Sequence, residues 1–257
     1  MTDLATIARH LDGLLETQSI PDYPGALNGV QLSNRSAISR IAASVDVSKR
    51  VIDSVIRAEA NLLLVHHGMF WGGAQPITGA AYDRLRLLLD HDVAVYSSHL
   101  PLDAHPTLGN NVLLARTLGL EPNAGFARYR TIDVGVRGDA DEDTTELWRR
   151  ADAFARSHGG IARSTIIPAS HRTRRWAVCT GAGASSDSLL EAQTLEIDTL
   201  IVGEGPHHTA VAADDIGLVV IYAGHYATET LGVRALAGHL TTTFGIPSTF
   251  IAAPTGL

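Results

Sequence analysis

Short apolar runs alternate with helical stretches along this chain, and that alternation constrains its fold more than any other feature. Residues 41–45 form an apolar run, residues 51–58 have helical period, and residues 62–65 form a second, continuous apolar run. A run of that length and composition is typical of a strand buried on both faces of a parallel sheet. The three segments together predict a β-α-β unit, so we expect an α/β fold.

The alternation continues on both sides of this unit. An amphipathic helix is predicted over residues 4–15, because apolar residues recur there at spacings of three and four. Between Glu121 and Arg130 the pattern loosens, with Pro122 and Gly125, and we place a domain boundary there. Further helices are predicted over 81–89, 111–118, 142–157, 188–195 and 227–244, and further strands over 93–97, 131–138, 176–179, 199–202, 219–223 and 248–252.

Two stretches of the chain resemble each other. Residues 41–67 run strand, turn, helix, strand and His-His, and residues 176–208 repeat that order with Gly-Glu-Gly-Pro before their own His-His pair. Weak internal duplication is the economical interpretation, and it predicts two related α/β layers rather than one wide sheet. Coincidence is the alternative, because β-α-β units are common.

The composition argues against several classes of function. The single cysteine, Cys179, cannot form an internal disulfide or a thiolate zinc site. A formal net charge of −7, from 20 basic and 27 acidic residues without a basic cluster, argues against a nucleic-acid partner. No window has the apolar length of a membrane span, so we expect a cytoplasmic protein with no membrane partner.

Histidine stands out, with 12 residues in the chain. Functional side chains of open α/β sheets gather at the carboxyl ends of strands, because the loops there meet at one edge. With a single cysteine, any metal must be held by imidazole and carboxylate groups. Seven histidines fall in four segments that each follow a predicted strand: His66 and His67, His99 and His105, His207 and His208, and His225.

The His66-His67 pair requires a local change in strand geometry. Adjacent side chains of a strand point to opposite faces, so the two rings share a target only if the strand period breaks, which Gly68 permits. Two imidazoles leaving the strand there can each hold one ion of a close pair. The alternative is a solvated loop with two ordinary histidines.

A carboxylate accompanies the next histidines. Asp103 lies between His99 and His105, shortly after a predicted strand, and Pro101 stiffens the loop that carries it. The alternative is that Asp103 is a turn residue or a helix cap.

A second carboxylate lies four residues after His225. On a helix, His225 and Glu229 share a face and can chelate one ion, and a glutamate can also bridge two ions. The alternative is that His225 or Thr228 caps the helix and that Glu229 favours its positive end.

The donors in these segments make the set expected for a pair of borderline divalent metal ions. Such a pair lowers the pKa of a bound water and polarises a carbonyl, amidine or phosphoryl oxygen, which predicts metal-assisted hydrolysis. The set is His66, His67, Asp103, His225 and Glu229.

The glycine-rich turn over residues 179–186 lies between a predicted strand and a predicted helix, where a phosphate-binding loop would lie. It resembles half of a dinucleotide fingerprint, but Ser186 replaces the third glycine, so we expect a tight β-α turn and assign no cofactor-binding residue. Cys179 is expected to be a small buried apolar residue.

Five motifs lie in order along nearly the whole chain, at residues 28–32, 63–68, 97–103, 203–208 and 224–229. Together they resemble the Nif-three-like dinuclear-metal hexameric proteins, many of which are named GTP cyclohydrolase type 2 homologues. One departure is Gly68-Met69-Phe70, where the family usually has Pro-Leu-Phe or Pro-Leu-Ile after His-His. The chain also lacks the large middle insertion of some members.

The resemblance implies site residues. His66, His67, Asp103, His225 and Glu229 match the family's metal ligands, with Glu229 at the bridging position. His99 and His208 match histidines beside the metals, where they orient a ligand or transfer a proton.

The resemblance also implies a fold and an assembly. It implies two related α/β domains, residues 1–125 with about 224–257 and residues 126–223, the C-terminal segment returning to the first domain. It further implies that the chain assembles as a toroidal homohexamer. The cofactor is two divalent metal ions per chain, with zinc, iron, manganese and nickel all compatible with the ligands.

Two functions follow from different classes of protein. The first is a metal-dependent hydrolase of a small-molecule substrate, a nucleotide or another heterocycle. The second is a non-catalytic metal-binding scaffold or a regulatory, metal-handling protein. Five ligands shared by two metals leave positions open for water and substrate, which favours the enzyme.

Overall fold

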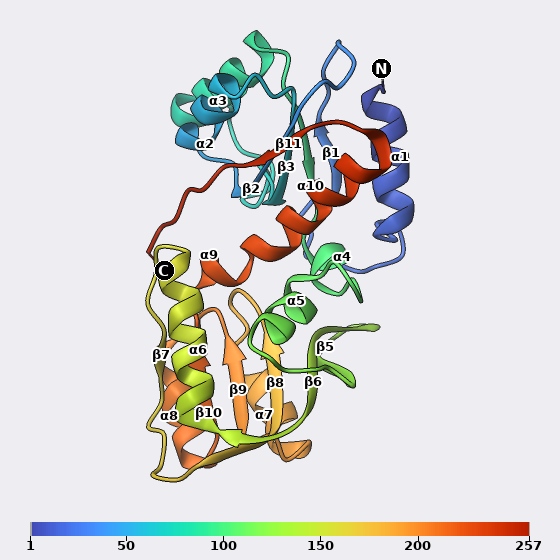
Figure 1. The fold of residues 1–257 in the computed structure, drawn as a ribbon. Helices are drawn as coiled ribbons and strands as arrows, with labels where there is room; N and C mark the ends of the chain where they lie inside the picture. Colours follow the sequence, from blue (N-terminus) through green and yellow to red (C-terminus); the bar gives the residue numbers. More distant parts are fainter. Residues whose placement is uncertain (1, 257) are drawn as a thin grey trace. The chain divides into compact units, whose positions relative to one another are not determined.

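A computed structural model describes residues 2–256 as two compact units, each built around its own sheet (Figure 1). The first unit comprises Met1–Leu102 and Gly232–Ala253, and the second comprises Asp103–Leu231 and Pro254–Leu257. Helices and strands alternate in both, which confirms the predicted α/β class. Within the described range, no helix combines the length and the apolar character needed to cross a bilayer.

The first unit contains a five-stranded sheet in the order β1-β4-β3-β2-β11. All neighbours in it are parallel except β1 and β4, which are antiparallel. Its strands are β1 (Gly29–Leu32), β2 (Ile41–Asp46), β3 (Leu62–His67), β4 (Ala94–Ser97) and β11 (Ser248–Phe250), and its helices include α1 (Leu4–Leu14), α2 (Lys49–Arg57), α3 (Gly79–Asp90) and α10 (Thr230–Phe244).

The predicted β-α-β unit lies at the centre of this sheet as β2, α2 and β3. The Ser48 side chain caps α2 by accepting a hydrogen bond from the Val51 N–H, and the helix buries Val51, Ile52 and Val55. These side chains pack in one core with Leu63 and other sheet residues, so the helix covers one face of the sheet. Because β2, β3 and β4 are parallel, their carboxyl ends meet at one edge, and Asp46 pairs there with His67.

The second unit contains a six-stranded sheet in the order β5-β6-β8-β9-β10-β7. The neighbours β8, β9 and β10 are parallel, and the remaining pairs are antiparallel. The strands are β5 (Ala124–Tyr129), β6 (Ile132–Asp143), β7 (Arg163–Ser164), β8 (Arg172–Cys179), β9 (Thr199–Val202) and β10 (Val219–Tyr222).

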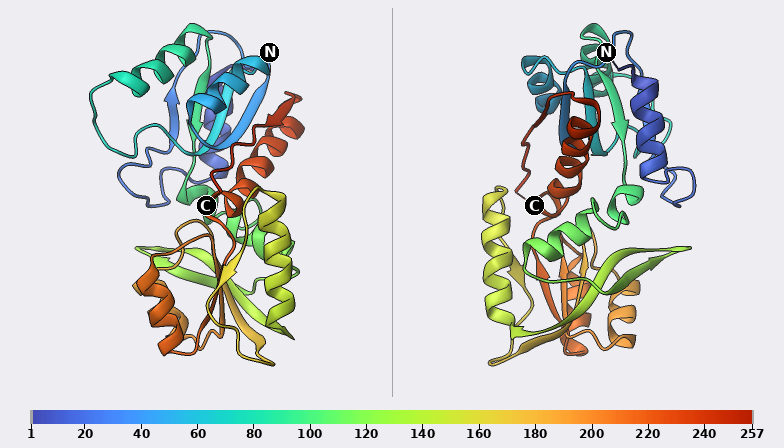
Figure 2. Two further views of the ribbon diagram at one scale, coloured as in Figure 1. Left: turned by 90° about the vertical axis from the view of Figure 1, so that its left-hand side faces the viewer. Right: turned by 45° about the vertical axis from the view of Figure 1, so that its right-hand side comes forward.

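Helices cover both faces of the second sheet. One apolar core joins Leu114 and Leu147 to Trp176, and the other joins Leu189 and Ala213 to the opposite face. Figure 2 shows α6 and α8 on opposite sides of the sheet accordingly. The helices are α5 (Asn110–Thr117), α6 (Thr144–Ser157), α7 (Ser186–Thr194), α8 (His207–Asp215) and α9 (His225–Thr228).

The bounds of the two units differ from the domains expected at residues 125 and 224. Residues 103–125 cluster with the second unit, because α5 buries Leu114, Ala115 and Leu118 in the core around Trp176. Residues 224–231 do the same through Ala227. A loosened sequence pattern marks a change of element, whereas the bounds of a unit depend on where apolar faces pack.

Several elements differ from the sequence prediction. The long helix expected over 227–244 is two helices, α9 and α10, with Glu229 between them as the C-cap of α9. The short helix α4 (Leu100–Asp103) and the strands β1, β5 and β7 were not predicted. Each is short or lies at a sheet margin, where the apolar periodicity is weak.

Candidate metal centre

Three histidines of the first unit come together at the carboxyl edge of its sheet. His66 and His67 end β3, and His99 follows β4. One potential ligand atom from each of the three lies within 4.8 Å of the others. The ring centroids of His66 and His67 are 4.8 Å apart, and that of His99 is 4.9 Å from His66 and 5.7 Å from His67.

Each of these rings has an acceptor beside its Nδ1 atom. The Nδ1 atoms of His66, His67 and His99 lie 2.9, 2.9 and 2.8 Å from acceptor oxygens. Carbonyl and carboxylate oxygens only accept, so Nδ1 carries the hydrogen and, in the neutral ring, Nε2 keeps a lone pair for a metal. The acceptors are Ser98 O, Asp46 Oδ1 and Asp22 Oδ1, respectively.

Contrary to the expectation from the sequence, Gly68 does not break the strand period after the two histidines. Both histidines lie inside β3, and Gly68 is not among the described residues with positive φ. A Cβ on Gly68 would lie 2.1 Å from Gln31 Nε2, so glycine makes room for that amide instead of bending the strand. Gln31 accepts from the Met69 N–H and donates to Ala26 O, which ties the loop after β3 to residues 26–27.

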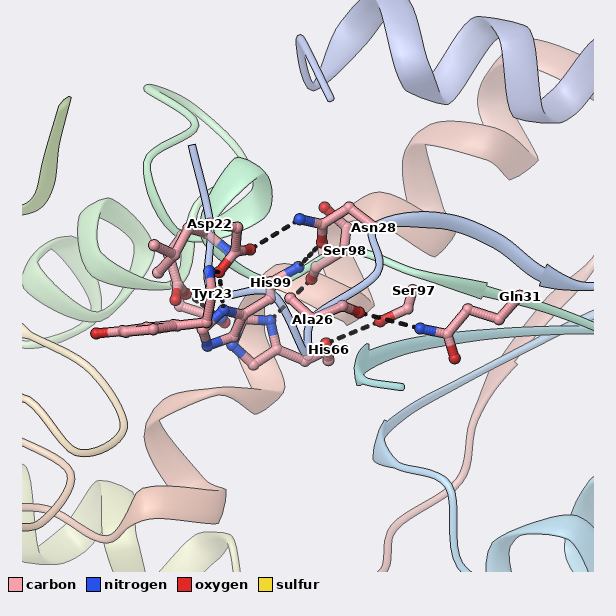
Figure 3. Close-up of polar contacts among 12 residues, drawn as sticks. Asp22, Tyr23, Ala26, Asn28, Gln31, His66, Ser97, Ser98 and His99 are labelled. Carbon is pink, nitrogen blue, oxygen red and sulfur yellow. Dashed lines mark hydrogen bonds and ion pairs between the residues drawn. The ribbon is translucent and has the colours of Figure 1, made fainter. Parts of the chain in front are cut away.

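Asp22 and Asn28 hold His99 in place (Figure 3). Asp22 Oδ2 accepts hydrogen bonds from Asn28 Nδ2 at 2.8 Å and from the Leu100 N–H at 2.9 Å. Burial raises the pKa of the Asp22 carboxyl, but the hydrogen bonds from His99, Asn28 and Leu100 outweigh it and hold that pKa below its usual value. Asp22 is therefore ionised at neutral pH.

His225 and Glu229 come together in the second unit, as their spacing predicts. His225 Nδ1 lies 2.9 Å from Glu204 Oε1, and His225 Nε2 lies 3.2 Å from Glu229 Oε2. Burial lowers the pKa of His225, but the Glu229 and Glu204 carboxylates overcome this effect and raise it to about 9. The site between His225 and Glu229 thus attracts positive charge, whether a proton or a cation.

Glu229 is 3% exposed, and a glycine makes room for it. Gly181 has a φ of +60°, and a Cβ there would lie 2.1 Å from Glu229 Oε1. Gly183 has a similar function, because its Cβ would lie 2.0 Å from Cys179 O. The glycine-rich turn is therefore a tight turn that allows close packing, and burial raises the pKa of the Cys179 thiol to about 12.

The other histidines and acids singled out in the sequence have varied surroundings. Asp103 is 6% exposed, and its Oδ1 accepts a hydrogen bond from Asn110 Nδ2 at 2.8 Å. His208 is exposed in the first turn of α8, and its catalytic role stays a prediction. His105 Nδ1 accepts from the N–H groups of Thr107 and Leu108, which places the hydrogen of its neutral ring on Nε2, the reverse of the clustered histidines.

The donor set fits a divalent metal. Four imidazoles, His66, His67, His99 and His225, have Nδ1 beside an acceptor oxygen, and Glu229 and Asp103 are buried carboxylates. Metal-binding histidines characteristically have such an acceptor on the second nitrogen. Sequence reasoning missed three of those acceptors, Asp22, Asp46 and Glu204. The signal for Asp46 was its position at the end of the strand beside β3.

Several known proteins are similar to this chain over nearly its whole length. A protein of Deinococcus radiodurans named GTP cyclohydrolase 1 type 2 homolog is 38% identical over 257 residues, covering 98% of this chain and 93% of that protein. The protein of the same name from Pyrococcus horikoshii is 37% identical over 258 residues, covering 99% and 100%. The crystal structure of TTHA1606 from Thermus thermophilus matches with a TM-score of 0.86 at 33% identity and covers 100% of both chains.

The family assignment extends across the chain. The sequence profile of Duf34/NIF3 (NGG1p interacting factor 3) matches residues 2–255. The resemblance of the five motifs is confirmed by this match and by the named relatives. The chain belongs to the Duf34/NIF3 family.

Proposed function

We propose that the chain is a metal-dependent hydrolase that binds two divalent metal ions. The ligands are His66, His67, Asp103, His225 and Glu229, with Glu229 as the bridging carboxylate. The observation that carries this proposal is the acceptor oxygen beside Nδ1 of each candidate histidine, which is the partner that metal-binding histidines characteristically have on their second nitrogen. Zinc, iron, manganese and nickel all suit these ligands.

The chemistry divides between the ions and the chain. Bound divalent ions would lower the pKa of a water and polarise an electrophilic centre of the substrate. The chain contributes orientation, because Asp46, Glu204 and Ser98 each accept a hydrogen bond from an imidazole Nδ1 and so orient the ring. It also contributes a dry environment, since Glu229 and Asp103 are almost wholly buried.

Exposed aromatic rings beside the histidines favour a heterocyclic substrate. The Trp71 ring meets His99 edge-on at a centroid distance of 4.7 Å, and Tyr23 lies 6.0 Å from the same ring. Tyr23 is 50% exposed and Trp71 is 38% exposed, so both rings are accessible to a ligand. Aromatic side chains bind planar rings by stacking, and a nucleobase is such a ring. The relatives named GTP cyclohydrolase homologs agree with this class of substrate.

The assembly and the cellular location rest on the resemblance and the composition. We propose a toroidal homohexamer in the cytoplasm. Light scattering coupled to size-exclusion chromatography is expected to give the mass of six chains. A monomer or dimer at micromolar concentration contradicts this part of the proposal.

Elemental analysis of protein purified without chelator, followed by a hydrolysis screen, tests the function. We expect two metal ions per chain, loss of metal in Glu229→Ala, and turnover of nucleotides or small cyclic amidines that stops with EDTA. Fewer than one metal ion per chain, unchanged in Glu229→Ala, overturns the dinuclear site. Full metal content without turnover of any substrate supports the non-catalytic scaffold instead.

A further inference from the structure

We propose that His99 is a further metal ligand of the His66–His67 cluster and that Asp22 is the positioning residue that directs it. The family resemblance places His99 only beside the metals, so this inference extends the ligand set. It rests on the proposed function, because it requires that the cluster binds a metal.

The geometry of His99 resembles that of the two neighbouring histidines. All three offer a potential ligand atom within 4.8 Å of the others. All three also have an acceptor oxygen at 2.8 to 2.9 Å from Nδ1. At this separation, one divalent cation could take one nitrogen from each of the three rings. His105 differs from them, because its Nδ1 accepts hydrogen bonds from the N–H groups of Thr107 and Leu108.

His99 is held in place at both its backbone and its ring. Its N–H donates to Asn28 Oδ1 at 2.7 Å, and its Nδ1 donates to Asp22 Oδ1 at 2.8 Å. Asn28 Nδ2 in turn donates to Asp22 Oδ2 (Figure 3). Asp22 and Asn28 thus brace both the backbone and the ring of His99, and the side chains of His99 and Asp22 are only 12% and 7% exposed. Such fixation is costly for an ordinary histidine and useful for a metal ligand.

Asparagine at position 22 cannot reproduce this arrangement. Asp22 accepts at both oxygens, from His99 and Tyr23 on one and from Asn28 and Leu100 on the other. An amide presents an NH2 group to one of these donor sets. It either loses the contacts to Asn28 and Leu100 or places a donor against His99 Nδ1, which favours the tautomer that carries hydrogen on Nε2.

Titration with Co²⁺, followed by visible absorption and by equilibrium dialysis, tests the proposal. We expect Asp22→Asn and His99→Ala each to weaken Co²⁺ binding about 10- to 100-fold, the range for loss of an anchor, and to change the d–d bands. The double variant should bind no more weakly than His99→Ala, because Asp22 acts through His99. Added imidazole should restore the d–d bands of His99→Ala, which a merely structural role would not do.

Asp12→Asn is the matched control. Asp12 is an acceptor for the buried Tyr96 hydroxyl in the same unit and is not bonded to the cluster. Its loss should leave Co²⁺ affinity unchanged. Wild-type affinity and spectrum in His99→Ala overturn the inference, as does an additive double variant. A wild-type chain that binds no Co²⁺ overturns the proposed function itself.

Discussion

Each unit carries one His-His pair after a parallel strand, and the two pairs have different surroundings. His66 and His67 end β3, where Ser98 O and Asp46 Oδ1 accept hydrogen bonds from their Nδ1 atoms. His207 and His208 begin α8 and are both exposed. The two His-His pairs follow similar β-α-β units, but they therefore differ in the groups that surround their side chains. The acceptor beside the second ring nitrogen, and not the His-His dipeptide itself, therefore distinguishes the candidate metal ligands.

Removing one member of each pair should produce the largest contrast. We expect His66→Ala to lose at least one metal ion per chain, because a buried donor at the cluster disappears. His208→Ala should keep its full metal content, because that ring is exposed at a helix start. Elemental analysis of both variants checks this. Equal metal loss in the two would show that the pairs are equivalent and that the anchoring acceptors are irrelevant.

In the second unit, the variant Gly181→Ala tests whether Glu229 is a metal ligand. The added Cβ would lie 2.1 Å from Glu229 Oε1, so we expect this variant to bind metal more weakly and to be less stable. Gly217→Ala is the matched control, because its φ of +70° is similarly strained but nothing lies within 4 Å. Both should lose about 1–2 kcal/mol of unfolding free energy from the left-handed backbone. Unchanged metal affinity in Gly181→Ala would argue against Glu229 as a ligand.

Aromatic neighbours also distinguish the first pair, since Trp71 meets the ring of His67 edge-on at 5.6 Å. Trp71→Ala should raise KM for a heteroaromatic substrate about 2- to 10-fold, as expected for the loss of one aromatic contact. Metal content should not change. Tyr82→Ala removes another exposed aromatic ring, on α3, and should leave KM unaltered. A fall in kcat without a change in KM would contradict a role in ring binding.

The smallest effect is expected at a third pair of histidines, which are far apart in the sequence but have stacked rings in the fold. His10 Nε2 and His239 Nε2 lie 2.8 Å apart. Burial, and repulsion from His10, lower the pKa of His239 below its usual value. The folded chain thus binds this proton less readily than the unfolded chain. The stability that neutral His239 contributes is therefore complete above about pH 6.5, and it is lost as the pH falls through the pKa of His239 in the folded chain.

Urea unfolding at pH 7.5 and pH 5.5 measures this contribution. On acidification, the free energy of unfolding should fall further in the wild type than in His239→Gln. The difference should be only a fraction of about 1 kcal/mol, because the ring is partly exposed and solvent screens its charge. Metal removal with EDTA beforehand keeps the cluster from contributing. An identical acid response in the two proteins would assign the loss to other groups.

Much of the fold could be predicted from apolar periodicity. The strands 199–202 and 219–223 and the β-α-β unit around residues 41–65 appear where the pattern indicates them. The short strand β1 was not found, because four residues at a sheet edge carry little pattern. The acceptors that hold the site histidines could not be predicted either, because Asp22 lies 77 residues from His99 and Glu204 lies 21 residues from His225. No local spacing rule connects residues so far apart.

The class of fold and the kinds of metal donor that are available follow from the sequence alone. Alternating apolar runs specify an α/β architecture, and 12 histidines with one cysteine restrict any metal to nitrogen and oxygen ligands. Which histidines have an oriented ring depends on the tertiary structure. That choice depends on an acceptor oxygen within hydrogen-bonding distance of Nδ1, and only folding brings Asp22, Asp46 and Ser98 to the histidines they hold.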